Sequence, residues 1–341
     1  MNNLNSTINH IKNMFFSIAS INGIPTIEMI NLVRNIKHFF NYVSFESING
    51  QVLIGTVTNE SIKNTQLNKI DCMDELLYFY SKENRNNDIC LFVDEEEQIW
   101  SSILDIEQIE KLQLEGNFYK LTSDKKEFIT HNNVTIQLTQ PDNKKSCFTN
   151  LDFEFLRCQL KAYKDESARK STCMLLNDAW HNPKDRKEFK SRPEHYMRDS
   201  LTQFLKNVFT RRAVVHPEQN VDDSHPVDIK VTFKNTNRTA ILEVKWLGDS
   251  ISNSGKKIKY RDARAKEGAK QLNDYLDKIS SHEPQNETRG YLIVFDARRK
   301  DEDLFFYQNK EIEYDPKYDE IRPDFDEPLR FFIEPILTTS S

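Results

Sequence analysis

The sequence predicts an α/β protein of two domains, with an α+β domain over residues 1–145 and an α/β domain over residues 146–341. Two arms of strictly alternating apolar and polar residues, 227–233 and 239–247, are typical of half-buried strands joined by a polar turn. The continuous apolar run Tyr291–Phe295 is typical of a central strand covered on both faces. A helix pattern lies between the hairpin and this run, which indicates a parallel crossover.

The first domain begins with a helix that Pro25 opens and whose apolar face extends to Val43. Asn49-Gly50, the strongest two-residue hairpin signal, then separates two short strand-like runs. The elements expected here are strands at 42–48, 51–58, 89–93, 118–121 and 134–138, helices at 73–80 and 98–112, and a linker at 140–146. Because the domain has no Gly-rich nucleotide loop and no repeat, its sequence assigns it no function.

The second domain has the element order α-β-β-β-α-β around the hairpin. Its strongest helix pattern runs from Pro193 to Phe209, with proline at the first turn. The other elements expected are helices at 148–163, 167–180 and 262–279, a strand at 213–216, a polar loop at 252–261 and an acidic tail at 301–341. The order predicts one sheet with helices on both faces.

The net charge of −6 over 341 residues is unevenly distributed. Residues 151–300 carry 30 basic against 22 acidic side chains, whereas the segments before and after them are acidic. A basic excess around the hairpin suits phosphate binding, although charge blocks also serve solubility alone. Five scattered cysteines without a C-x-x-C spacing favour a reducing cytoplasm and no structural zinc. There is no secretory signal at the N-terminus and no apolar run near the ~18 residues of a membrane helix, so no membrane association is expected.

The hairpin places three chemically useful side chains on one face. Folding the chain about its turn sets position i opposite roughly 473 − i, so that Asp228 faces Lys245 and Lys230 faces Glu243. A slip of two residues changes these partners but not the face, because strand side chains alternate with period two. Two carboxylates on one face supply the hard oxygen ligands that Mg²⁺ prefers, and a neighbouring lysine positions an attacking water. The alternative is a solvated hairpin face with an incidental ion pair.

In these residues the sequence resembles the PD-(D/E)XK nuclease superfamily. Asp228 matches the first acid of its motif and Glu243-Val244-Lys245 the E-x-K, while Pro226 lies one residue early. Gln271 and Tyr275, one helix later, resemble the Q-x-x-x-Y motif of bacterial recombination exonucleases. The resemblance covers about 193–297 and implies a restriction-endonuclease-like core, a mixed central sheet flanked by helices. The chain has no ligand set for the cysteine iron–sulfur cluster that those exonucleases often add.

The resemblance implies catalysis by Asp228, Glu243, Lys245 and Gln271, with Mg²⁺, or Mn²⁺ as a substitute, held by Asp228, Glu243 and the Val244 carbonyl. Glu194 projects from the first turn of its helix along the apolar stripe, where a carboxylate needs a partner, so it is a further candidate ligand. Its alternative is a helix-start residue that the helix dipole favours.

A basic run precedes the Q-x-x-x-Y helix, and it is expected to hold phosphates without reading bases. The nucleic-acid-binding candidates are Lys256, Lys257, Lys259, Arg261, Arg264 and Tyr275. For the basic residues the alternative is a solvated loop, and for Gln271 and Tyr275 it is surface packing.

The function expected is therefore a cytoplasmic, metal-dependent nuclease, an endonuclease that cleaves DNA, with RNA not excluded. By analogy with nucleases fused to unrelated modules, it would act in restriction or antiphage defence, with the first domain sensing a signal, binding a protein partner or activator, or selecting the substrate. Two alternatives stay open: a nucleic-acid-binding protein without turnover, and a non-catalytic subunit of a complex. Association of identical copies is also left open.

Overall fold

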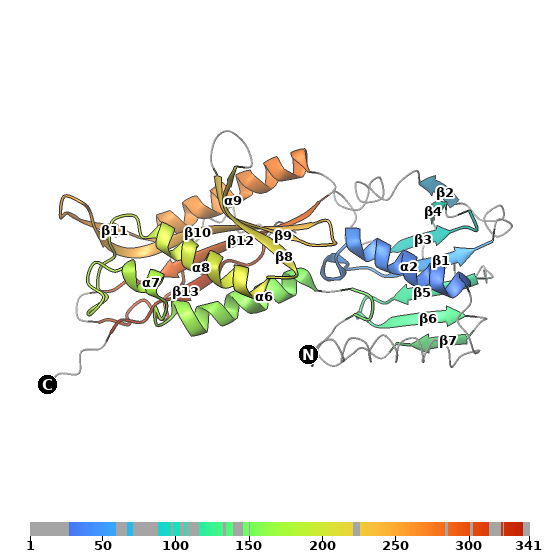
Figure 1. The fold of residues 1–341 in the computed structure, drawn as a ribbon, viewed down its shortest axis with the longest axis horizontal. Helices are drawn as coiled ribbons and strands as arrows, with labels where there is room; N and C mark the ends of the chain where they lie inside the picture. Colours follow the sequence, from blue (N-terminus) through green and yellow to red (C-terminus); the bar gives the residue numbers. More distant parts are fainter. Residues whose placement is uncertain are drawn as a thin grey trace. The chain divides into compact units, whose positions relative to one another are not determined.

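A computed structural model describes the chain in part. The described residues are 27–58, 67–70, 88–96, 98–102, 106, 109, 116–131, 134–138, 146–149, 151–220, 226–283, 286–300, 303–313, 322 and 324–336. The chain divides into two compact units, Met1–Leu151 and Asp152–Ser341, so the division falls six residues after the expected boundary at 145. Each unit contains a mixed sheet with helices, which confirms the α/β class (Figure 1).

The first unit is built on a seven-stranded sheet in the order β2-β4-β3-β1-β5-β6-β7. The strands are β1 (Val52–Val57), β2 (Leu67–Ile70), β3 (Ile89–Val93), β4 (Ile99–Ser102), β5 (Gly116–Leu121), β6 (Glu127–His131) and β7 (Val134–Gln137). Helix α2 (Ile27–Tyr42) packs its apolar face against β1 and β5 in one core cluster. The predicted opening helix and the strands at 51–58, 89–93, 118–121 and 134–138 are thereby confirmed.

Several predictions for this unit are wrong. The run 42–48 is not a strand, because α2 continues to Tyr42 and a 3-10 helix, η1, covers Phe45–Ser47. There is no hairpin at Asn49-Gly50, since β1 pairs with β3 and β5 instead. The expected helix at 98–112 begins as the strand β4. The helix expected at 73–80 and the linker at 140–145 lie outside the described residues.

The second unit is built on a six-stranded sheet in the order β13-β12-β10-β9-β8, with β11 paired to β10. Its strands are β8 (Ala213–Asn220), β9 (Pro226–Phe233), β10 (Arg238–Ile251), β11 (Lys257–Tyr260), β12 (Glu287–Asp296) and β13 (Leu329–Phe332). The hairpin β9–β10 is antiparallel, and residues 238–247 of β10 run parallel to the whole of β12. This arrangement confirms the predicted hairpin and the parallel connection.

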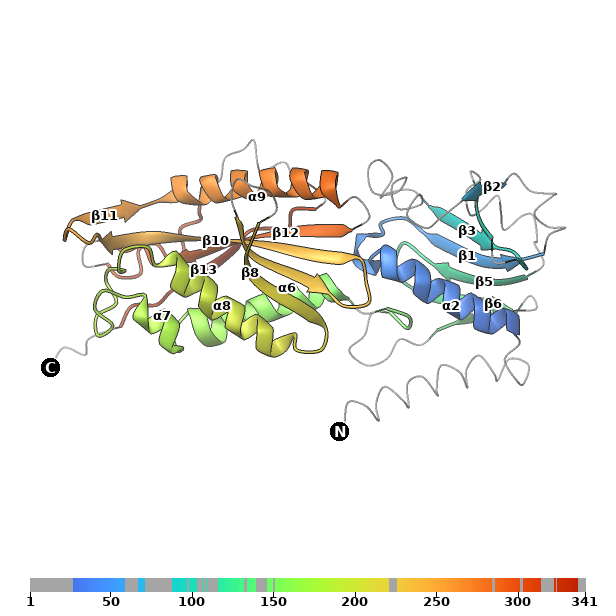
Figure 2. The same ribbon diagram turned by 45° about the horizontal axis from the view of Figure 1, so that its top comes forward.

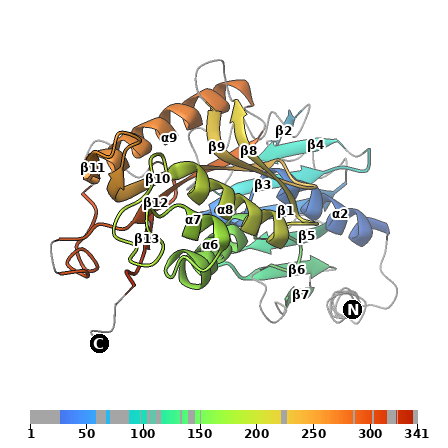
Figure 3. The same cartoon turned by 60° about the vertical axis from the view of Figure 1, so that its left-hand side comes forward.

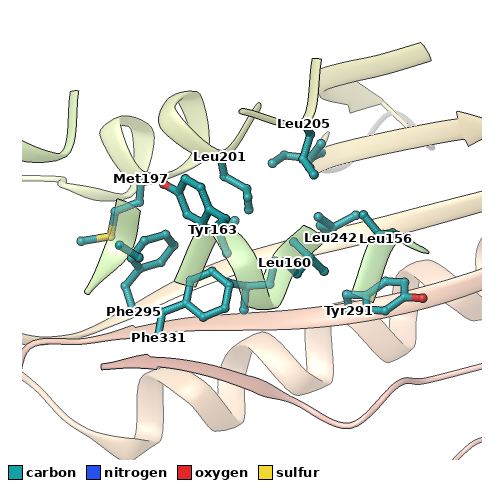
Figure 4. Close-up of a cluster of buried hydrophobic side chains, with 14 of the residues drawn as sticks. Leu156, Leu160, Tyr163, Met197, Leu201, Leu205, Leu242, Tyr291, Phe295 and Phe331 are labelled. Carbon is teal, nitrogen blue, oxygen red and sulfur yellow. The ribbon is translucent and has the colours of Figure 1, made fainter. Parts of the chain in front are cut away.

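Helices cover both faces of this sheet (Figures 2 and 3). They are α6 (Asp152–Tyr163), the π-helix η2 (Lys164–Ala168), α7 (Met174–Asp178), α8 (Glu194–Val208) and α9 (Asp262–His282). On one face, Leu242 and Tyr291 pack against α6 and α8 (Figure 4). On the other, Ile241 and Leu292 pack against α9. Alternate residues of β10 therefore point to different helix layers, as the alternation of a strand requires.

Three segments of the second unit differ from expectation. The helix expected at 167–180 is interrupted, because the π-helix η2 ends at Ala168 and α7 covers only Met174–Asp178. The polar loop expected at 252–261 is an arm of two strands, because β10 continues to Ile251 and pairs with β11. The acidic tail contributes a parallel edge strand, β13. There, Arg330 donates to the buried carboxylate of Asp296, with a distance of 2.7 Å from Nε to Oδ2. The acidic composition of a segment did not predict its place in the sheet.

In the described part of the chain, no helix combines the length and the apolar character that crossing a membrane requires.

Candidate active site

The site forms where the hairpin β9–β10 ends. Thr239 lies opposite Thr232 and Leu242 opposite Ile229, so position i lies opposite 471 − i. The predicted register is thus wrong by two residues, but the prediction that Asp228 and Glu243 share one face of the hairpin agrees with this register. Lys230 lies opposite Ile241, not Glu243, and its ammonium contacts Glu283 at 3.2 Å. The register would place Asp228 opposite Glu243, and the charge of Asp228 helps to raise the pKa of Glu243.

The side chain of Asp228 bonds to the backbone of β10 just beyond the last β9–β10 pair, Leu242 and Ile229. Its Oδ2 accepts a hydrogen bond from the Val244 N–H at 2.8 Å, so the side chain substitutes for the next backbone partner of β10. In an extended strand the N–H and C=O of one residue point to the same side, so the Val244 carbonyl is directed to this edge as well. The other carboxylate oxygen of Asp228 lies 4.0 Å from Nη1 of Arg198 on α8. Asp228 and Val244 therefore present oxygens at the point where the pairing of β9 with β10 ends.

Lys245 links an acid of its own strand to an acid of α8. Its ammonium donates to Glu243 on its own strand and to Oε1 of Glu194 at 3.3 Å. The second oxygen of Glu194 accepts from Nη2 of Arg264 at 2.8 Å, which brings the start of α8 and the start of α9 together. Glu194 does point towards the sheet, as its helical position predicts, and a cation from each of two other elements neutralises it.

Gly268 allows α9 to approach Lys245. A Cβ at this position would lie 2.5 Å from Cγ of Lys245 and 2.9 Å from Cδ1 of Leu292. Neither distance leaves room for a methyl group, so glycine is required for the lysine stem to pass under the helix. Arg264 and Gly268, one turn apart on α9, therefore both face the site.

Burial controls the charge of the acids. Glu243 is 3 % exposed, and burial, with the nearby charge of Asp228, raises its pKa to about 8. Burial likewise raises the pKa of Asp228 to about 6, although the Lys245 ammonium opposes the rise. For Lys245, burial acts to lower the pKa, but Glu243, Glu194 and Asp228 outweigh it and raise the pKa. The cluster thus holds more negative charge than its surroundings solvate, which favours binding of a further cation.

A cleft of about 610 Å³ opens beside the cluster. Glu194, Asp228 and Arg264 line it, whereas Glu243 and Lys245 lie behind them. Arg192, His195 and Arg198 also line the cleft, and the sequence prediction missed all three. In the sequence, these three residues are marked only by their closeness to Glu194 at the start of a predicted helix. That closeness does not predict which strand the start of the helix will contact.

The basic residues of the arm are largely turned away from the cleft. Ile258 and Tyr260 line it, so the alternating Lys257 and Lys259 lie on the opposite face of β11. Lys257 contacts Asp249 at 3.0 Å and Glu188 at 3.1 Å, and Arg261 contacts Asp249 at 2.9 Å.

Of the remaining candidates, Lys256 and Lys259 are exposed, and Arg264 reaches the cleft through its pair with Glu194. The expected basic phosphate-binding loop is thus partly neutralised by its own acids.

The two residues of the Q-x-x-x-Y motif have different positions from those expected. Tyr275 is buried in α9 and its hydroxyl donates to the Pro226 carbonyl at 3.2 Å, so it supports the start of β9 and has no surface for contact with nucleic acid. Gln271 is partly buried, and its Oε1 atom is buried without a hydrogen-bond partner in the described structure. Among the described residues, no hydrogen bond joins Gln271 to Asp228, Glu243 or Glu194.

The donor chemistry fits a hard divalent cation. Asp228, Glu243 and the Val244 carbonyl supply oxygens, and Mg²⁺ commonly binds through one or two carboxylates, with water and substrate phosphate as the other ligands. Among the described residues, no three His, Cys, Asp or Glu side chains form a ready ligand group. The residues therefore fit a metal that shares its coordination with water and substrate.

No protein-family model matches the sequence, and neither a curated protein nor a solved structure matches the chain. Proposals for this site therefore rest on its own residues and their geometry.

Proposed function

We propose that this protein is a metal-dependent nuclease that hydrolyses phosphodiester bonds, with DNA as the main substrate. The observation that supports this most is the convergence of Asp228, Glu243 and Lys245 at the edge of a cleft that also exposes arginines. The order α8-β8-β9-β10-α9-β12, with β11 added, agrees with a restriction-endonuclease-like core of the PD-(D/E)XK type. The motif and the order of elements thus support the same function.

Different residues of the chain would have different roles in this reaction. Asp228 and Glu243, with the Val244 carbonyl, would hold Mg²⁺ or Mn²⁺, and Glu194 would bind through water. When bound, the metal supplies Lewis-acid stabilisation of charge on the phosphate and a water of lowered pKa. Lys245 would orient the attacking water. Arg264 and Arg198 would hold the phosphate by charge-assisted hydrogen bonds.

One observation favours a second candidate, a nucleic-acid-binding protein without turnover. Lys245 pairs with Glu194 and Glu243, and Arg264 pairs with Glu194, so two of the acids have cationic partners in the absence of a metal. The two candidates differ in one measurable respect, because only the nuclease releases cleavage products.

The test is incubation of the full chain with labelled single-stranded DNA, duplex DNA and RNA, in Mg²⁺, Mn²⁺ or EDTA. Glu243→Gln should abolish metal-dependent cleavage, a loss of at least about 100-fold, and should leave thermal stability unchanged or higher, since it removes a buried carboxyl whose ionisation is unfavourable. Glu283→Gln, which alters a partly exposed acid paired with Lys230, is the matched control and should retain activity. Binding without cleavage under every metal condition would favour the second candidate, and cleavage by Glu243→Gln at the wild-type rate would refute the site.

A further inference from the structure

The two walls of the cleft differ in chemistry. One wall is the arm β10–β11, in which Ser250 lies opposite Ile258 and Gly248 opposite Tyr260. Ile258 is 38 % exposed, and the ring of Tyr260 lies 4.4 Å from that of Trp246, which is buried behind it. This wall therefore presents an aromatic ring, held in place from behind, next to an exposed aliphatic side chain.

The opposite wall carries basic side chains, two of which are paired with acids: Arg198 with Asp199 and Glu218, and Arg264 with Glu194 and Glu267. Arg192, His195 and Arg198 come from the start of α8, and Arg264 comes from α9. Arg192 is exposed, and its guanidinium forms no ion pair with any described residue. Its φ of 55° lies in the left-handed region, which is unusual for a residue before proline. The carbonyl of Arg192 accepts a hydrogen bond from Nδ1 of His195 at 2.6 Å, which helps to hold this conformation.

The hollow extends beyond the acids. A second hollow of about 720 Å³ shares Ser191, Arg192, His195 and Ser252 with the cleft and continues to Ser254 at the tip of the arm. The two hollows thus form one groove, with Arg192 and His195 along its middle and Asp228 at one end. Each is in the range of about 300–1,000 Å³ that accepts a small molecule, so the groove would hold a few nucleotides of one strand.

We infer that this groove binds single-stranded nucleic acid, with a base against Tyr260 and Ile258 and its phosphates along Arg192, Arg198 and Arg264. Aromatic rings facing cationic side chains are the features that bind single strands, because every base has a face that stacks and every linkage has a charge. In a duplex the base faces are already stacked on one another, so they are not available to stack on Tyr260. The inference deepens the proposed function, and it rests on that function only where it takes the bound strand to be the substrate. Binding of a single strand in the groove does not itself require cleavage.

The experiment measures binding without turnover. The full chain carrying Glu243→Gln is titrated, in EDTA, against fluorescent oligo-dT, oligo-U and a blunt DNA duplex, and anisotropy is followed at several salt concentrations. The single strands should bind at least tenfold more tightly than the duplex. Tyr260→Ala should weaken single-strand binding by roughly tenfold, in line with the loss of one stacked base, and leave duplex binding unchanged, whereas Tyr260→Phe should retain it.

The wall of basic side chains has its own test. Arg192→Ala should weaken single-strand binding and reduce the slope of log affinity against log salt by about one, the loss of one phosphate contact. Lys259→Ala is the matched control, because Lys259 lies on the other face of β11. This substitution should leave the ratio of single-strand affinity to duplex affinity unchanged.

Duplex binding as tight as single-strand binding, or single-strand affinity unchanged in Tyr260→Ala, would overturn the inference. Should Tyr260→Ala unfold, Ile258→Ala provides the same comparison with a smaller loss. Single-strand binding that depends on Tyr260, with no cleavage by the wild-type chain in Mg²⁺ or Mn²⁺, would refute the nuclease and leave the groove assigned. Cleavage at the wild-type rate in Tyr260→Ala would support the nuclease and refute the assignment of the groove.

Discussion

Gly268→Ala tests how closely the site is packed. The added Cβ would lie 2.5 Å from Cγ of Lys245, in the middle of a side chain that Glu243 and Glu194 hold by its end. The stem has to shift, because the helix backbone is the less flexible partner. Alanine in place of glycine inside a helix stabilises by about 1 kcal/mol, whereas overpacking of a core destabilises by roughly 1–3 kcal/mol.

The net change expected is a destabilisation of about 0–2 kcal/mol. For a unit of this size, that lowers Tm by roughly 0–8 °C. The effect on cleavage should be larger, about 100-fold, because a catalytic group displaced by about 1 Å loses its alignment. The measurements are thermal denaturation and initial cleavage rates in saturating Mg²⁺.

Gly290→Ala is the matched control. Its Cβ would meet Cδ1 of Leu276 at 2.8 Å and Cδ1 of Leu272 at 3.0 Å, so it overpacks the same layer without touching Lys245. It should lower Tm and keep the cleavage rate of the wild type. Equal effects of the two substitutions on rate would mean that Gly268 matters only for packing.

The same substitution in a Lys245→Ala protein tests the packing by stability alone, without a cleavage assay. In Lys245→Ala the atoms that clash with the new methyl group are absent, and the remaining close atom, Cδ1 of Leu292, ends a flexible side chain. Gly268→Ala should then stabilise the protein by about 1 kcal/mol, the helix-propensity gain alone. If Gly268→Ala destabilises both backgrounds equally, the two residues do not interact and the reasoning is wrong.

Two further predictions concern buried charges outside the site. Burial raises the pKa of Glu127, although Tyr119, Ser146 and the Cys147 N–H all donate to it. The unfolded chain therefore releases this proton at lower pH than the folded chain, so stability should fall as pH rises from about 4.3 towards the raised value. Denaturant unfolding from about pH 4 to 7 should show this slope, and Glu127→Gln should flatten it; parallel curves would contradict the prediction. Arg238 is 1 % exposed and its Nη1 donates to Asp152 at 2.9 Å, so Arg238→Ala should destabilise by roughly 3–5 kcal/mol in the same assay, and a loss below about 1 kcal/mol would show that the pair is dispensable.

Local periodicity was enough to predict much of the second unit. The helix at Pro193, the hairpin, the helix at Asp262 and the central strand were all visible as repeating apolar positions, because each such pattern reflects the face that one element buries. The shared face of Asp228, Glu243 and Lys245 was also predictable, since an error of two residues in register leaves it unchanged. In the first unit the patterns were shorter, and a strand at Ile99–Ser102 was mistaken for the start of a helix.

Contacts between distant segments were decided only by the tertiary structure. Lys257 and Arg261 looked like free cations in a loop, but the pairing of β11 with β10 brings them to Asp249, and Glu188 joins from another segment. Arg192 and His195 carried no signal in sequence, because their place in the groove depends on where the start of α8 meets the arm β10–β11. Periodicity in a sequence reports which side of an element is buried, and it carries no information about which element covers that side.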